Sequence, residues 1–338
     1  MTRRKWSGIH LGAAVSTCVA VACSSFGSSD EPAPPQSNEA GADGALPEAS
    51  APDAACADRC PPIELARFMD EPVATVVLSR THVFWNTMQS LASGAGNVYS
   101  CLKSGCAGAP TRLERGATNV VRGLGSDGAQ RTYGGAFYAN GGLVELAPTA
   151  LTPRLPSDAA GNPMQMSVRA DALFYVSFYE PATQQRTVRR WDYGGDVTTP
   201  CSFTKGDLTT AAAFTTARVY LHANAKGDLY SCELIGTRGE FVKYGSNLYI
   251  DSLTATADRV FWSQDGSVTS GADGAMDTLL RGELMPADVG SKVTTVTFTG
   301  GELFVTTAGG ELWSCAPENC KATLRKIAGA GILESVHL

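Results

Sequence analysis

The chain has 338 residues, of which 43% are hydrophobic and only 18% are charged, and 36 are glycine. Few charges and many glycines disfavour coiled coils and long helical bundles and favour a turn-rich, all-β protein. The formal net charge of −6 argues against a nucleic-acid binder that works by neutralising phosphates.

Residues 1–22 have the pattern of an export signal: a basic start at residues 3–5, then an uncharged and largely apolar run over residues 9–22. At about 14 residues, this run is too short for a permanent membrane span. It ends in Ala20-Val21-Ala22-Cys23, which resembles the bacterial lipobox, with Ala20 where the family usually has Leu. The resemblance implies a lipid on Cys23 and, since no Asp follows, sorting to the outer membrane. Ordinary secretory cleavage near Ala22 is the alternative, and it also places the mature protein outside the cytoplasm.

Residues 23–62 are predicted to be a disordered tether. Residues 24–55 hold six acidic residues, no basic ones, five prolines and only two large apolar side chains, Phe26 and Leu46. Such a segment cannot bury enough apolar surface to offset its chain entropy. A flexible chain of this length spans about 30 Å, so we expect it to hold the folded body clear of the membrane surface.

Residues 63–338 contain an internal repeat, most visible in a strand with a central aromatic or apolar residue. This strand occurs as Val83-Phe84-Trp85, Ala136-Phe137-Tyr138, Leu173-Phe174-Tyr175, Arg218-Val219-Tyr220, Val260-Phe261-Trp262 and Leu303-Phe304-Val305. One aromatic residue from each copy marks the repeat: Phe84, Phe137, Phe174, Tyr220, Phe261 and Phe304. Successive markers are separated by 53, 37, 46, 41 and 43 residues. A following strand begins with Gly and, in three repeats, ends in Tyr/Trp-Ser-Cys, as in Gly227–Cys232.

Four short strands per repeat, joined by tight turns, are typical of a β-propeller blade, whose aromatic residues fill the space between blades. We therefore predict an all-β propeller of six four-stranded blades, with seven as the alternative. The 53-residue step is interpreted as an insertion at Asn119–Arg131 in a degenerate second blade. Residues 63–66 are expected to be a fourth strand, and residues 333–338 a first strand, that pair to close the ring.

The repeats resemble those of extracytoplasmic six-bladed propellers of the TolB-like and YWTD-like kinds. The Val-Phe-Trp strands are similar to the aromatic pair of that family, although its following Asp is replaced by Asn86-Thr87 and Ser263-Gln264. The resemblance is architectural and includes no catalytic motif.

Eight cysteines follow the predicted tether's acidic part, and an even number in an exported chain indicates disulfides. We expect the pairs Cys101–Cys106 and Cys315–Cys320 within blades, Cys201–Cys232 between the third and fourth blades, and Cys56–Cys60 at the end of the tether. A zinc site is disfavoured because the spacings are not C-x2-C and no histidine lies near any pair.

The sequence predicts no catalytic residues: no H-x-H, H-E-x-x-H, G-x-S-x-G or phosphate-binding loop occurs. His82 and His222 are interpreted as surface or turn residues, and Gly123-Leu124-Gly125 and Gly194-Gly195 as turns. The tryptophans Trp85, Trp191, Trp262 and Trp313 are expected between blades. The candidate ligand contact is Arg189-Arg190-Trp191, the densest cationic and aromatic spot, with a solvated strand as the alternative.

These patterns favour a lipid-anchored binding or scaffold module, monomeric, that recognises an envelope protein or glycan through its loops. The alternative is a propeller-type hydrolase or lyase with a metal in its channel, which needs several polar ligands converging from different blades. No metal or other cofactor is predicted. A calcium ion is the alternative, with Asp228 or Asp265 otherwise interpreted as turn formers.

Overall fold

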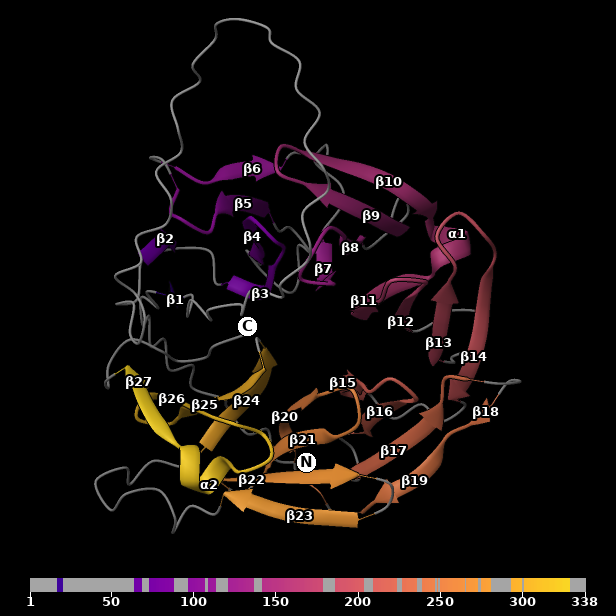
Figure 1. Cartoon of the computed structure of the whole chain (residues 1–338). Helices are drawn as coiled ribbons and strands as arrows, with labels where there is room; N and C mark the ends of the chain where they lie inside the picture. Colours follow the sequence, from indigo (N-terminus) through magenta and orange to yellow (C-terminus); the bar gives the residue numbers. More distant parts are fainter. Residues whose placement is uncertain are drawn as a thin grey trace, which may run out of the picture.

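A computed structural model describes residues 17–20, 64–68, 73–87, 97–106, 109–113, 121–136, 142–178, 186–203, 209–223, 227–235, 239–246, 248, 250–264, 266–272, 275–280, 293–299 and 301–328. Six sheets, each with four antiparallel strands, are arranged around a central axis, and the first of these four strands is innermost (Figure 1). The protein is therefore an all-β propeller of six blades, as the repeat pattern predicts.

The first three blades are numbered in chain order. The first contains β3 (Val73–Leu78), β4 (His82–Thr87), β5 (Val98–Leu102) and β6 (Thr111–Leu113). The second contains β7 (Val121–Ser126), β8 (Thr132–Ala136), β9 (Gly142–Ala147) and β10 (Ala150–Pro156), followed by the one-turn helix α1 (Ser157–Ala160). The third contains β11 (Asn162–Val168), β12 (Leu173–Phe178), β13 (Arg186–Trp191) and β14 (Val197–Phe203).

The last three blades follow the same order. The fourth contains β15 (Thr209–Phe214), β16 (Arg218–Ala223), β17 (Asp228–Glu233) and β19 (Val242–Gly245). The fifth contains β20 (Ile250–Ala255), β21 (Val260–Gln264), β22 (Ser267–Ala272) and β23 (Ala275–Leu280). The sixth contains β24 (Val293–Thr299), β25 (Glu302–Thr307), β26 (Leu312–Cys315) and β27 (Arg325–Ala328), with the one-turn helix α2 (Cys320–Thr323) before β27. Within the described ranges, no helix is long and apolar enough to cross a membrane.

The expected closure of the ring is only partly visible. A strand does form near residues 63–66, as β2 (Glu64–Phe68), but it pairs with β1 (Thr17–Ala20) in a separate two-stranded sheet. This sheet is drawn between the first and sixth blades in Figure 1. The fourth strand of the sixth blade is β27, so the assignment of residues 63–66 to that role is wrong. Residues 333–338 lie outside the described residues.

Second strands pack on both of their faces, because successive side chains of a strand point to opposite faces. Phe84 packs against Val121 and Leu124 of the second blade, whereas Val83 and Trp85 belong to a cluster on the opposite face. The same alternation joins the later blades through the pairs Tyr133 and Tyr175, Phe174 and Leu221, Tyr220 and Trp262, and Phe261 and Val305. Trp191, Trp262 and Trp313 lie in clusters that join two blades, as expected, whereas the described cluster around the buried Trp85 holds residues of the first blade.

The second blade differs from its predicted register. The segment 119–131, interpreted as an insertion, contains its first strand, β7. In β8 the residue equivalent to Phe84 is Tyr133, four residues before the predicted Phe137, which lies outside the described residues. With Tyr133 in place, the steps between equivalent residues become 49, 41, 46, 41 and 43 residues, and the repeat is regular without an insertion.

Glycines in the second blade allow the third blade to approach it closely. A Cβ atom on Gly123 in β7 would overlap the carbonyl group of Met164 in β11, and one on Gly135 would overlap that of Pro163. Gly123-Leu124-Gly125 therefore lies in a strand, and its interpretation as a turn is wrong. Gly194 does lie in a turn, with a φ of 93° that favours glycine.

Three disulfides form among the described residues, two within blades and one between blades. Cys101–Cys106 and Cys315–Cys320 each close a short loop after the third strand of a blade, and Cys201–Cys232 joins β14 of the third blade to β17 of the fourth. The short strand β18 (Gly239–Glu240) crosses the same boundary and pairs with β14 in parallel. Cys56 and Cys60 lie outside the described residues.

Candidate functional site

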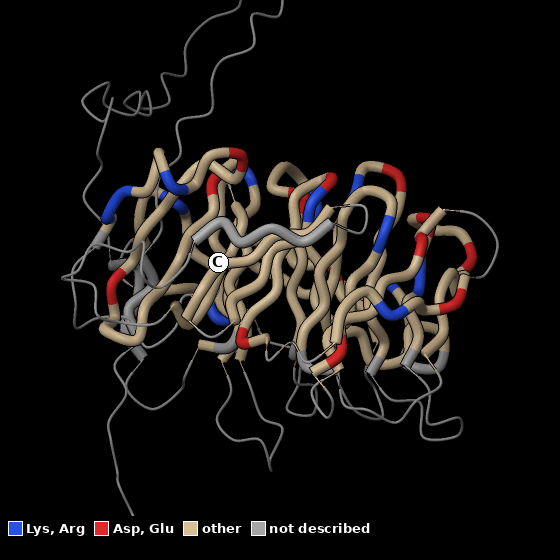
Figure 2. Tube along the Cα trace, turned by 90° about the horizontal axis from the view of Figure 1, so that it is seen from below, with Lys and Arg blue, Asp and Glu red and all other residues tan. Residues whose placement is uncertain are grey.

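One face of the propeller carries the turns between the first and second strands of each blade, and we call it the turn face. In three blades this turn begins with Ser or Thr, whose hydroxyl accepts a hydrogen bond from the backbone nitrogen three residues later: Ser79 with His82, Thr215 with Arg218 and Thr256 with Arg259. Such side-chain contacts fix a tight turn locally. In the edge-on view of Figure 2, many charged residues gather in the loops along the upper edge of the ring.

Neighbouring turns are bonded to one another from the first blade to the fifth. The backbone nitrogen of Arg80 donates to the Ala129 carbonyl at 3.2 Å, and that of Thr216 donates to the Ala257 carbonyl at 2.6 Å. Arginine side chains make the two links between these: Arg131 donates to the Ala170 carbonyl, and Arg169 donates to the carbonyls of Thr215 and Thr216. The turn face is thus internally bonded across four successive blade boundaries.

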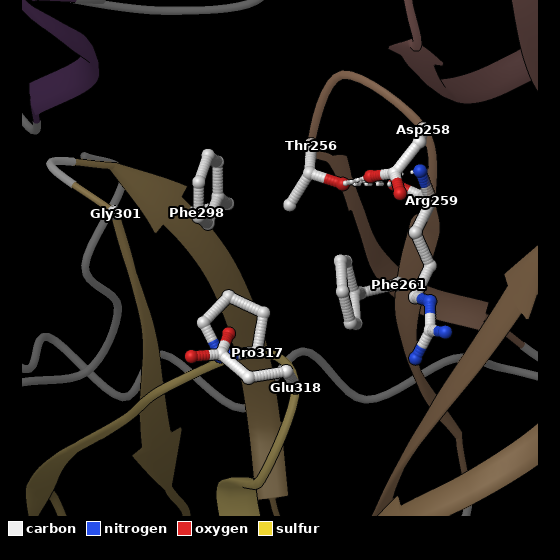
Figure 3. Close-up of a pocket in the computed structure, with 8 residues that line it drawn as sticks. All are labelled: Thr256, Asp258, Arg259, Phe261, Phe298, Gly301, Pro317 and Glu318. Atoms are coloured by element: carbon white, nitrogen blue, oxygen red, sulfur yellow. Dashed lines mark hydrogen bonds between the residues drawn. The ribbon is translucent and has the colours of Figure 1, made fainter.

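At the next boundary, between the fifth and sixth blades, the turn face is hollowed instead (Figure 3). The cavity has a volume of about 290 Å³ and is lined by Thr256, Asp258, Arg259, Phe261, Phe298, Gly301, Pro317 and Glu318; we call it the hollow. The cavity is open on the side of the sixth blade, where β24 and β25 are joined by a tight turn between Thr299 and Glu302. Gly301 in that turn has no side chain, and a Cβ built there would meet no atom within 4 Å.

The hollow combines an apolar floor with charged groups at its rim. Phe261 is fully buried, and Phe298 and Pro317 are half-buried. In Figure 3 the Phe261 ring faces the Phe298 and Pro317 side of the cavity across the open space. The Thr256 hydroxyl donates to the Asp258 carboxylate at 2.8 Å.

Three charged residues line the rim, Asp258, Arg259 and Glu318, and none of them has an ion-pair partner in the described part of the chain; Asp258 accepts a hydrogen bond from Thr256. Arg218, which occupies the position of Arg259 in the fourth blade, does have an ion-pair partner: its guanidinium bonds the Glu233 carboxylate at 2.9 Å. An arginine that is half-buried and not bonded within the protein keeps its donors available to a ligand. The hollow can therefore accept an apolar group between charges of both signs.

The candidate contact Arg189-Arg190-Trp191 is not gathered on one surface. Trp191 is buried in the cluster between the second and third blades. Arg190 pairs with Asp192 at 2.7 Å, and Arg189 donates to the Ala159 carbonyl at 2.5 Å. These side chains are engaged within the protein, so we base no site on them.

The histidines and acids singled out in the sequence also have internal roles. His82 begins β4 on the turn face, whereas His222 lies buried near the opposite end of β16, so the two do not converge. His222 donates from Nε2 to the Leu248 carbonyl at 2.9 Å. Asp228 is buried and bonded to Lys243 at 2.7 Å and to the Tyr230 hydroxyl. Asp265 lies outside the described residues, and within them no three His, Cys, Asp or Glu side chains gather into a metal site.

Sequence reasoning did not find the hollow. The signal that was available is the turn pattern Ser/Thr-x-x-His/Arg, as in Ser79–His82, Thr215–Arg218 and Thr256–Arg259. This pattern marks where each turn begins, but it does not show at which boundary between blades a cavity forms.

No family profile and no curated protein sequence matches the chain. Several solved structures share its fold. The structure of YCF48 bound to D1 peptide is similar with a TM-score of 0.53 and 10% identity, over 75% of this chain and 82% of that one. YCF48 from Cyanidioschyzon merolae gives 0.54 and 9%, over 78% and 88%. The WD40 β-propeller domain of Doa1 gives 0.50 and 13%, over 79% and 84%. At these identities the similarity shows the propeller fold alone.

Proposed function

We propose that this chain is an exported, lipid-anchored protein whose propeller is a binding or scaffold module for an envelope or extracellular partner. The anchor is supported by Cys23 at the end of the signal-like segment. Export is supported by three disulfides, because such bonds form and persist in oxidising compartments.

The observation that carries the binding role is the hollow. Hydrogen bonds link neighbouring turns of the turn face across four blade boundaries. At the fifth boundary the face has a cavity whose three rim charges, Asp258, Arg259 and Glu318, have no ion-pair partner in the described ranges. Concave, largely apolar sites with a few polar groups are the usual form of a binding site. Among the similar structures, YCF48 is seen bound to a peptide, which says what that propeller binds.

The alternative of a hydrolase or lyase has no specific observation in its favour. It needs polar ligands from several blades that converge, and the described residues bring no three such groups together. We therefore keep the binding role as the proposed function.

Metabolic labelling with an alkyne-tagged palmitate analogue in a bacterial host tests the anchor. We expect the full chain to be labelled and the Cys23→Ser variant to be unlabelled. The matched control is Cys18→Ser, which alters the other cysteine of the signal-like segment and should keep the label. Label that persists in Cys23→Ser, or that is absent from the natural sequence, contradicts lipidation at Cys23.

Photo-crosslinking in the full chain tests the binding role. A photoreactive amino acid replaces Glu318 at the hollow or, as the control, Val242, which is 66% exposed on the outer strand of the fourth blade. We expect a discrete adduct from position 318 that is absent from position 242. No adduct at either position, or the same products at both, argues against the hollow as the binding site.

A further inference from the structure

The shape of the hollow suits one flat side chain. Phe261 closes its floor, and Phe298 and Pro317 form the opposite side (Figure 3). At about 290 Å³ it lies at the small end of ligand pockets, large enough for an aromatic side chain and part of its backbone. Aromatic rings gain extra stabilisation when they stack or meet edge-to-face, so an aromatic group is the best filling for walls of this composition.

The rim adds a charge requirement. Arg259 presents a guanidinium with no bonded carboxylate among the described residues, and Glu318 presents an exposed carboxylate. The two come from different blades, the fifth and the sixth, and lie at the rim of one cavity. A complementary ligand therefore has an acidic group toward Arg259 and a basic group toward Glu318.

We infer that the hollow binds a peptide segment in which one aromatic side chain is flanked by an acidic residue on one side and a basic residue on the other. This inference rests on the proposed binding function and names the class of partner. A glycan is the less suitable occupant, because a sugar ring presents several hydroxyls that need donors and acceptors. The walls, Phe261, Phe298 and Pro317, offer side chains without any.

Arg259 differs from Arg218, its equivalent in the fourth blade, in having no ion pair among the described residues. The Arg218 guanidinium donates a hydrogen bond to the Glu233 carboxylate within the fourth blade. Arg259 forms no ion pair in the described part of the chain, so a charge-assisted hydrogen bond is left for the ligand.

Selection of random linear heptapeptides displayed on phage against the immobilised full chain provides the probe. We expect enriched peptides to share an aromatic residue with Asp or Glu on one side and Lys or Arg on the other. An enriched peptide is then synthesised with a fluorescent label, and its affinity is measured by fluorescence polarisation.

Charge reversal at the rim decides the role of Arg259. We expect Arg259→Glu to weaken the peptide at least tenfold, and a peptide with its acidic residue changed to Lys to recover most of that loss. The matched control, Arg218→Glu, occupies the equivalent turn position in the fourth blade and should leave the affinity within twofold. Equal losses in both variants, or no recovery with the charge-swapped peptide, overturn the inference. Enrichment without aromatic residues also overturns it.

Failure of the inference and failure of the proposed function are distinguishable. If position 318 photo-crosslinks a partner whose capture is insensitive to Arg259→Glu, or a partner that proves to be a polysaccharide, the binding role stands and the peptide inference is wrong. If position 318 gives no adduct in cells but a selected peptide binds the hollow with the expected dependence on Arg259, the hollow can bind a peptide in vitro, and the proposed role of binding an envelope partner there is wrong.

Discussion

Asn86 donates a hydrogen bond from its side-chain nitrogen to the backbone carbonyl of Val121, 2.6 Å away across the boundary between the first and second blades. Asn86 is fully buried and directly follows Trp85 in β4. The equivalent residues of the fourth and fifth blades are His222 and Ser263. His222 bonds the carbonyl of Leu248, just before the fifth blade, and Ser263 bonds that of Thr294 in the sixth. This strand position is therefore a recurrent polar link between blades.

We expect Asn86→Asp to lower the free energy of unfolding by about 3 kcal/mol, because the variant removes the donor and buries a charged oxygen opposite the Val121 carbonyl. Urea unfolding at neutral pH measures the change. Asn319→Asp, at an exposed position before α2, is the matched control and should shift stability by about 0.5 kcal/mol or less. Unchanged stability in Asn86→Asp would mean that the contact is not needed.

The buried imidazole of His222 makes stability depend on pH. Burial lowers the pKa of His222, against the opposite effects of its bond to the Leu248 carbonyl and of Asp251. Since the folded-state pKa lies below the unfolded value of about 6.5, His222 contributes full stability above that pH and loses it as the pH falls toward the folded pKa.

We therefore expect His222→Gln to lose less stability than the natural chain between pH 7.5 and pH 5, measured by urea unfolding at each pH. His82→Gln, which changes the half-exposed histidine at the start of β4, is the control and should follow the natural chain. Parallel pH curves for His222→Gln and the natural chain contradict the assignment.

The close approach of β11 to β7 predicts a large effect at Gly123. A Cβ atom there would overlap the Met164 carbonyl group, and backbone cannot move aside as a flexible side chain can. We expect Gly123→Ala to lower the unfolding free energy by about 3 kcal/mol or more. Gly128→Ala, in an exposed turn with open space around it but a φ of 75°, should cost only about 1 kcal/mol. Similar midpoints for the two variants in thermal unfolding would exclude the predicted clash.

The three disulfides should differ in their contributions to stability. Loop-closure entropy grows with the length of chain enclosed, which is 31 residues for Cys201–Cys232 and 5 for Cys101–Cys106. We expect replacement of both cysteines by Ala to cost about 3–4 kcal/mol for the first pair and about 2 kcal/mol for the second. Chemical unfolding of the two double variants gives the comparison, and a larger loss for Cys101–Cys106 would contradict it.

Much of the fold was predictable from the sequence because side chains alternate between the two faces of each strand. Five of the six second strands were placed correctly because an aromatic or branched residue, such as Phe174 or Phe261, marks a position that must pack between blades. The second blade was misplaced because Gly134 and Gly135 replace the bulky residues of that strand, and because β7 itself contains glycines that suggest a turn. Gly123 and Gly135 are required by the backbone of β11, and Gly134 by the side chains of Val121 and Leu146; no local pattern reveals these neighbours.

The hollow was not predictable in the same way. Its lining comes from three separate places in the chain: the turn at Thr256–Arg259 with Phe261 of β21 after it, Phe298 of β24 with Gly301 after it, and the loop at Pro317 and Glu318. Each segment is ordinary for a propeller turn when considered alone. The strand register shows that Arg259 lacks the carboxylate that Arg218 has, because Ala272 stands where the fourth blade has Glu233; only the packing of the fifth blade against the sixth shows that a cavity forms beside it.

The position of the hollow also matters for the mechanics of the ring. The bonds between turns run from the first blade to the fifth and do not continue at the hollow among the described residues. Any molecule held there touches the fifth and sixth blades together and acts as a clamp across that joint. A bound ligand should therefore hold the fifth and sixth blades together, and amide hydrogen exchange in β20 and β24 should be slower when the hollow is occupied.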